Sequence, residues 1–138
     1  MTSGGYASPN GLLFALTNST TTTITGLTLG FDYERYRINT AAASVTFFTS
    51  TDGATWSALT AGDSGAFATG TNAYTFSGGT VVSKSGLNIS SLSIGQNQTY
   101  YLKWNFNTPG SNSQGIGLDN FTASFATAAA SPAYYWVG

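Results

Sequence analysis

Apolar and polar side chains alternate along most of the chain, which is the pattern of strands with one buried face. Between residues 27 and 33, one face carries the apolar side chains Leu27, Leu29, Phe31 and Tyr33. Beyond Glu34 the phase slips by one residue, because Tyr36 and Ile38 now hold the apolar positions. Such a slip inside a long strand is typical of a β-bulge, which we expect near Glu34 and Arg35.

The same alternation predicts further strands, separated by residues that favour turns. They cover residues 44–51, 54–59, 72–76, 81–84, 87–92, 99–106 and 115–125. Asp52 and Gly53 form a tight-turn pair, so we expect the first two of these strands to form a hairpin. About eight to ten short strands without an amphipathic helix predict an all-β fold, an antiparallel β-sandwich that is jelly-roll-like. Its predicted core contains Phe31, Phe47, Trp104 and Phe106.

The sequence divides into three segments. Residues 1–11 form a lead-in, residues 12–125 the β-sandwich domain, and residues 126–138 a linker with an aromatic C-terminal tail. The tail contains Tyr134, Tyr135, Trp136 and Val137 and carries no charge. Because such a segment readily pairs with a free strand edge, we predict that these four residues form an assembly tail. It docks either on its own sandwich or on a neighbour, and the second alternative predicts self-association or binding to another surface protein.

Charged residues are scarce, at 7% of the chain, whereas soluble domains carry roughly 25%. The net charge is −1 and no basic run occurs, which excludes the electrostatic footprint of a nucleic-acid-binding protein. The chain has no His, which excludes the commonest general base, and no Cys, which excludes a disulfide. No apolar run approaches the roughly 20 residues of a membrane-spanning helix. The low charge is typical of an exported protein, so we expect a secreted or cell-surface protein whose signal sequence is absent from this chain.

Four spaced segments of the sequence carry a family resemblance. They are residues 31–39, 50–56, 100–104 and 113–121, which read FDYERYRIN, STDGATW, YYLKW and SQGIGLDNF. In this order they resemble the jelly-roll domains of exported bacterial proteins, including PEP-CTERM-type and other secreted surface proteins. The resemblance covers residues 12–125 and implies a bacterial jelly-roll β-sandwich that is secreted or held at the cell surface. It implies no catalytic residue.

Asp32 and Glu34 are the carboxylates placed best for catalysis. They lie two residues apart on one strand face, which is compatible with the two acids of an inverting glycosidase. However, the neighbouring Arg35 and Arg37 favour the ionised form of both, whereas a general acid must be protonated. Ser-based hydrolysis lacks its His. We therefore predict that the protein is not an enzyme.

Two acidic residues have structural interpretations. Residues 50–56 resemble the Asp-box hairpin of sialidases, one residue short of its spacing, which implies that Asp52 caps backbone amides and that Trp56 packs beneath. Asp119 is a candidate ligand for a structural calcium ion, because many jelly-roll carbohydrate-binding modules hold Ca²⁺ through an Asp in the last strand. The alternative is that Asp119 accepts backbone hydrogen bonds at a change of strand phase. No other cofactor is predicted.

The candidate ligand face consists of Tyr33, Tyr36, Trp56 and Tyr101. Aromatic rings flanked by Asn and Thr stack on sugar rings and hydrogen-bond their hydroxyls. Two functions therefore remain open. The first is a non-catalytic extracellular structural or adhesive module that assembles through its C-terminal tail into a surface or filamentous structure. The alternative is a carbohydrate-binding module of a secreted protein, with polysaccharide as its ligand.

Overall fold

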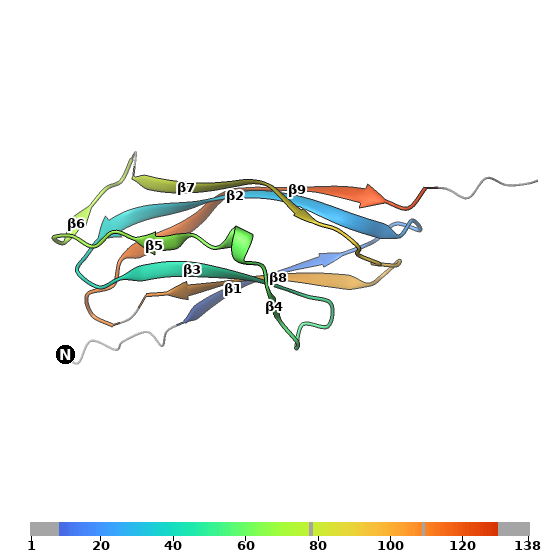
Figure 1. The fold of residues 1–138 in the computed structure, drawn as a ribbon, viewed down its shortest axis with the longest axis horizontal. Coiled ribbons are helices and arrows are strands. Elements are labelled where there is room, and N and C mark those ends of the chain that lie inside the picture. The colour runs from blue at the N-terminus through green and yellow to red at the C-terminus, as the bar shows by residue number, and fades with distance from the viewer. Residues whose placement is uncertain (1–8, 78, 109, 130–138) are drawn as a thin grey trace, which may run out of the picture.

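The computed structural model describes residues 9–77, 79–108 and 110–129 and contains two antiparallel β-sheets packed face to face (Figure 1). The predicted all-β sandwich is therefore confirmed. The elements are β1 (Asn10–Thr17), β2 (Ile24–Ile38), β3 (Ala43–Ser50), β4 (Ser57–Ala58), the 3₁₀ turn η1 (Thr60–Gly62), β5 (Gly65–Phe67), β6 (Ala73–Tyr74), β7 (Thr80–Ile89), β8 (Thr99–Asn107) and β9 (Gly115–Thr127).

Each sheet is organised around one or two long strands. The first sheet has the order β1-β8-β3, and the short strands β4 and β5 both pair with β3. In the second sheet β2 is central. It pairs with β9 along one edge, and along its other edge it pairs first with β7 and then, near its C-terminal end, with β6. The predicted hairpin is present, because Phe48 of β3 pairs with Ala58 of β4. The chain crosses between the sheets at β1–β2, β2–β3, β5–β6, β7–β8 and β8–β9, as in a jelly roll.

Three aromatic side chains from the two sheets meet in the centre of the core. Between ring centroids, Phe31 of β2 lies 5.4 Å from both Phe47 of β3 and Trp104 of β8. Phe47 and Trp104 are 5.0 Å apart, and all three residues are at most 1% exposed. We call these three residues the core aromatic cluster. Their predicted burial is confirmed, whereas Phe106 is only partly buried at the margin of the core.

Register shifts in β2 explain where its alternation changes phase. The pairing of β2 with β9 shifts between Arg35 and Arg37, next to the position predicted for the bulge. A second irregularity lies around Gly30 in the pairing with both β7 and β9, and the alternation did not reveal it. A Cβ atom on Gly30 would lie 2.6 Å from Oγ1 of Thr122, so a larger residue here would displace the Thr122 side chain.

Some elements differ from the predicted strands. The predicted strands 81–84 and 87–92 form the single strand β7, because Gly86 adopts φ +65° and bends the strand without ending it. The hairpin partner β4 and the strand β6 have only two residues each, and β1, η1 and β5 are not among the predicted elements. Strand residues 10–11 and 126–127 lie within the predicted lead-in and linker.

The predicted assembly tail, Tyr134, Tyr135, Trp136 and Val137, lies outside the described residues. Within the described ranges, no helix has the length and apolar character needed to cross a membrane.

The core aromatic cluster generates a stability prediction. Replacing Trp104 by Ala should lower the free energy of unfolding by about 3–5 kcal/mol, because it leaves a cavity between the sheets. Urea unfolding followed by circular dichroism measures the loss. Phe76→Ala is the control, because Phe76 is 88% exposed and its truncation should cost less than about 0.5 kcal/mol. Equal losses in the two variants would contradict the central role of the cluster.

Candidate functional site

Tyr33 does not belong to a ligand face, and this prediction is wrong. Its side chain is 0% exposed in the core between the sheets. The hydroxyl donates a 2.6 Å hydrogen bond to the carbonyl oxygen of Gly62 in η1. Burial, followed by the nearby Asp63 carboxylate, raises the pKa of Tyr33. The physical reason is in the alternation itself, because Tyr33 is in phase with the buried Phe31.

Tyr36 lies on the outer face of the second sheet, apart from the other candidates. It is 39% exposed, and its ring lies against Gly117 of β9. The hydroxyl donates a hydrogen bond to the carboxylate of Glu34, and this bond is the main cause of the raised pKa of Tyr36. Because the Tyr36 hydroxyl already donates its hydrogen to Glu34, it has no hydrogen left to donate to a ligand.

Trp56 and Tyr101 both lie on the outer face of the first sheet. Lys103 connects them, because its Nζ atom is 3.8 Å from the centre of the Trp56 ring and it follows Tyr101 by two residues on the same face of β8. Phe48 of β3 adds a third ring, 5.2 Å from the same Nζ atom. Two of the four predicted ligand residues are therefore neighbours in one aromatic and cationic patch.

The turn between β3 and β4 positions this patch. One oxygen of Asp52, Oδ1, accepts hydrogen bonds from the backbone amides of Ala54 and Thr55 at 2.8 and 2.7 Å and from the Ser50 hydroxyl at 2.8 Å. These bonds, that of Thr55 first, hold the pKa of Asp52 well below its usual range. Gly53 adopts φ +71°, and a Cβ there would meet the Tyr101 ring at 3.3 Å. The structure agrees with the capping role that the Asp-box resemblance implies for Asp52.

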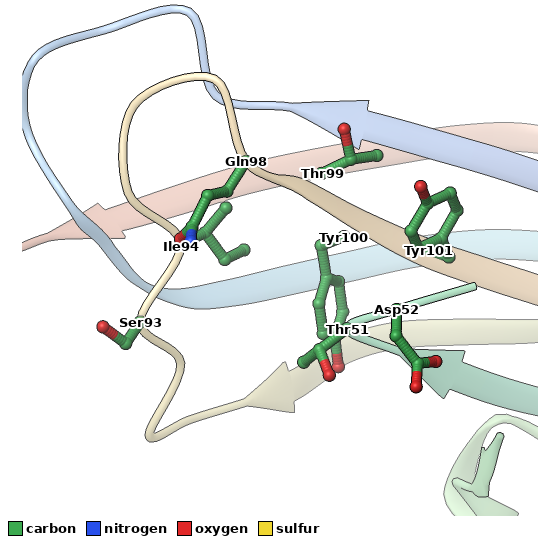
Figure 2. A pocket seen from close by; sticks show the side chains of 8 residues that line it. All are labelled: Thr51, Asp52, Ser93, Ile94, Gln98, Thr99, Tyr100 and Tyr101. Carbon is green, nitrogen blue, oxygen red and sulfur yellow. The ribbon is translucent and has the colours of Figure 1, made fainter. Parts of the chain in front are cut away.

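A pocket of about 340 Å³ lies beside this turn at one end of the sandwich (Figure 2). Its walls come from the Asp52 turn, from the loop between β7 and β8, and from the first residues of β8. The lining residues are Thr51, Asp52, Ser93, Ile94, Gln98, Thr99, Tyr100 and Tyr101. Of these, the sequence identified only Tyr101 as a ligand residue. The density of hydroxyl and amide side chains between residues 93 and 101 is the signal that could have indicated the others.

Asp119 is exposed on β9, and its Oδ1 atom accepts a 2.7 Å hydrogen bond from the backbone amide of Asn120. This bond fits the alternative interpretation of Asp119. Asn120 has φ +51° and donates from its side-chain amide to Asp32 at 2.7 Å. Across the residues that the structure describes, no three His, Cys, Asp or Glu side chains are grouped so that they could hold a metal ion. The calcium site therefore stays a prediction.

The carboxylate of Asp32 is held in its ionised form. Hydrogen bonds from the Ser83 hydroxyl, and then from the Asn120 amide, lower its pKa. A general acid of a glycosidase requires the opposite shift, so this environment gives no support to acid catalysis at the pair of Asp32 and Glu34.

The edges of β1 and β9 form what we call the open side of the sandwich. Within the described part of the chain, β1 pairs only with β8, and β9 pairs only with β2. The two edges lie on the same side, because the rings of Phe14 on β1 and Phe121 on β9 are 5.1 Å apart. Large apolar side chains remain exposed here: Leu12 at 44%, Leu13 at 56%, Phe14 at 42% and Phe125 at 51%.

An apolar slot of about 220 Å³ lies at one end of the open side. It extends between the sheets and is lined by Leu16 and Thr17 of β1, residues 18–20, Ile24 and Leu27 of β2, Ile94, and Phe125 and Thr127 of β9. We call it the open-side slot. The sequence did not reveal it, because strand alternation does not show which two edges of a sandwich lie next to each other.

Comparisons of the chain with protein-family models, with curated proteins and with solved structures found no match. Functional inference therefore depends on the geometry of the described residues.

The Asp52 turn generates a prediction about pH. Asp52→Asn should lower stability, because a neutral amide oxygen accepts the three hydrogen bonds less strongly than a carboxylate. The pKa of Asp52 is lower in the folded protein than the value of about 3.9 expected after unfolding, so the carboxylate stabilises the fold fully above about pH 4. This stabilisation is lost as the pH falls toward the folded-state pKa.

Thermal unfolding of both proteins between neutral and strongly acidic pH provides the measurement. The difference in Tm between the wild type and Asp52→Asn should be largest near neutral pH and should shrink below about pH 4. A difference that does not change with pH would show that the charge of Asp52 does not stabilise the turn.

Proposed function

We propose that the chain is a non-catalytic β-sandwich module of an exported bacterial surface protein and that its copies assemble through the open side. The observation that carries this proposal is the outer edge of β1, which no other strand of the described residues pairs with. The resemblance of four sequence segments to exported jelly-roll domains supports the cellular location.

Among the described residues, the strand β1 itself carries no charged residue, proline or bulge, which are features by which natural sheets prevent edge-to-edge association. Proteins protect such edges with charged residues, proline, bulges or covering loops. β1 reads NGLLFALT, and it pairs with β8 from Asn10 to Thr17 without a register shift. Three of its four large apolar residues, Leu12, Leu13 and Phe14, are more than 40% exposed. A regular, uncharged and apolar edge readily accepts another strand.

The edge of β9 is a weaker acceptor. It carries Asp119 and the left-handed residue Asn120 in its centre. Its ladder with β2 is irregular at three points, which twists the strand and interrupts the row of backbone groups along it. The proposal therefore assigns the acceptor role to β1.

The occupant that we propose for this edge is the segment 130–138 of a second copy. It contains Tyr134, Tyr135, Trp136 and Val137 and no charged residue. Its nine residues span about 30 Å when extended, which matches the length of about 27 Å for the eight residues of β1. An added strand would gain main-chain hydrogen bonds along β1, and its alternate side chains would gain apolar contacts.

The open-side slot gives such a strand a place for one aromatic side chain. The slot has a volume of about 220 Å³, and Leu16, Ile24 and Leu27 give part of its lining an aliphatic surface. Apolar cavities of about 150 Å³ accept benzene, so a tyrosine or tryptophan ring from the tail fits in size. Thr127, which ends β9, lines the same slot, so donor and acceptor regions of neighbouring copies would meet at one end of the sandwich.

Assembly of this kind is head-to-tail. Each copy contributes one tail and offers one edge, so successive copies extend into a filament or ring and do not stop at a two-fold dimer. An extended assembly suits a structural or adhesive role at a cell surface.

Sedimentation velocity over a range of concentrations tests the proposal. The full chain should form oligomers that grow with concentration, whereas a variant without residues 130–138 should be a folded monomer. Leu13→Lys should also be monomeric, because it adds a charge to the acceptor edge. Val81→Lys is the matched control, since Val81 is an exposed strand residue on β7, away from the open side, and this variant should assemble normally.

Two outcomes would overturn the proposal. The first is a full chain that remains monomeric at high concentration while removal of residues 130–138 lowers its unfolding free energy, because the tail would then be an edge strand of its own sandwich. The second is assembly that Leu13→Lys does not weaken, because the acceptor would then lie elsewhere.

A further inference from the structure

The pocket beside the Asp52 turn is lined by several residues that carry hydrogen-bonding side chains. Thr51, Ser93, Tyr100 and Tyr101 are among them, and their hydroxyls make no side-chain hydrogen bond to another residue that the structure describes. Gln98 uses Oε1 to accept from the backbone amide of Gly95 at 2.7 Å, which leaves the two N–H donors of its side chain available. The pocket thus offers several donors and acceptors within about 340 Å³.

These groups are held in place by the fold. Tyr100 is 4% exposed, so its ring is fixed in the core, and Figure 2 shows the ring extending from β8 toward Thr51. Tyr101 is fixed by contact with the Gly53 turn. On the opposite wall, Ile94 forms two 3.0 Å backbone hydrogen bonds with Ile24, which anchors the loop between β7 and β8 to the second sheet. Polar groups on such supports are preorganised for binding.

The charge of the lining narrows the class of ligand. None of the described residues that line the pocket is Lys or Arg, so these residues supply no counter-charge for a phosphate or carboxylate. Asp52 is its one ionisable acid, and its Oδ1 atom already caps the turn. A hydroxyl-lined cavity with one carboxylate and an aliphatic wall at Ile94 matches a neutral ligand that carries many hydroxyls and also apolar C–H faces.

Saccharides have this chemistry, and a volume of about 340 Å³ is at the lower end of the range for small-molecule sites. We propose that the pocket formed by the Asp52 turn and the loop between β7 and β8 binds the end of a neutral saccharide. Tyr100, Tyr101, Ser93 and Thr51 contribute hydroxyls, Gln98 contributes amide donors, and Asp52 accepts from the sugar through its second carboxylate oxygen. This site extends the function of the module beyond assembly, and it excludes Tyr33 and Tyr36 from the ligand contacts.

Titration of the ¹⁵N-labelled full chain with maltose, cellobiose, lactose and diacetylchitobiose, followed by NMR, tests the site. At least one of these sugars should shift amide resonances of residues 51–53 and 92–101 and of few others. Glucuronate should bind less well than glucose, because the Asp52 carboxylate repels an acidic sugar.

Three substitutions remove single hydroxyls from the pocket with little change of shape: Tyr100→Phe, Tyr101→Phe and Ser93→Ala. Each should weaken binding roughly 2- to 10-fold, the factor that one neutral hydrogen bond contributes. Tyr36→Phe is the matched control, because it removes an exposed tyrosine hydroxyl from the other sheet and should leave the affinity unchanged. Leu13→Lys should also leave it unchanged, which separates this site from assembly.

The proposal is overturned if none of the four sugars binds, or if binding persists undiminished in all three pocket variants. It is also overturned if the shifted resonances surround Trp56 and Lys103 on the outer face of the sheet and not the pocket. Loss of assembly in sedimentation with intact sugar binding would contradict only the role of the open side.

Discussion

Contact between the aromatic rings of Phe31, Phe47 and Trp104 holds the two sheets together, and the rest of the structure is arranged around it. The chain has no Cys and therefore no disulfide, and it has only four basic and five acidic residues. Its stability must come mainly from burying the inner faces of the sheets. The three rings belong to β2, β3 and β8, which are the central strands, and the remaining strands are positioned by pairing with them. This leaves the turns and edges free for function.

Alternation predicted the long strands and most of the core, because burial of one face imposes a period of two on β2, β3 and β8. It was less informative where glycine changes the backbone locally. Gly86 lies within β7, which the alternation divides into two strands. The register of β2 shifts around Gly30, although the alternation of its side chains does not change there. Tyr33 was assigned to a ligand face by its residue type, although its phase already indicated the core. The pocket could not be predicted, since its walls meet only after Ser50 of β3 pairs with Tyr101 of β8.

The pocket and the open-side slot share one wall. Ile94 lines both. The loop that carries it is tied to Asn18, whose side-chain amide donates to the carbonyl of Ile94 at 2.9 Å and whose backbone carbonyl accepts from the backbone amide of Asn97 at 2.7 Å. Asn18 is only 3% exposed, and both polar atoms of its side chain are hydrogen-bonded. Its Nδ2 also donates to the carbonyl of Thr22, and its Oδ1 accepts from the backbone amide and the hydroxyl of Thr20. One buried amide side chain therefore positions the region where the two candidate sites adjoin.

The pairing of β1 with β8 has a consequence for how the chain folds. Thr17 and Thr99 face each other across this pair although 82 residues separate them in the sequence. Closing so long a loop costs entropy before any contact is gained, and folds of this kind reach the native state slowly, on the order of milliseconds to seconds. During synthesis, β1 is made well before its partner β8. Until β8 is available, Leu12, Leu13 and Phe14 are open to any other unpaired strand, so folding competes with association during this interval.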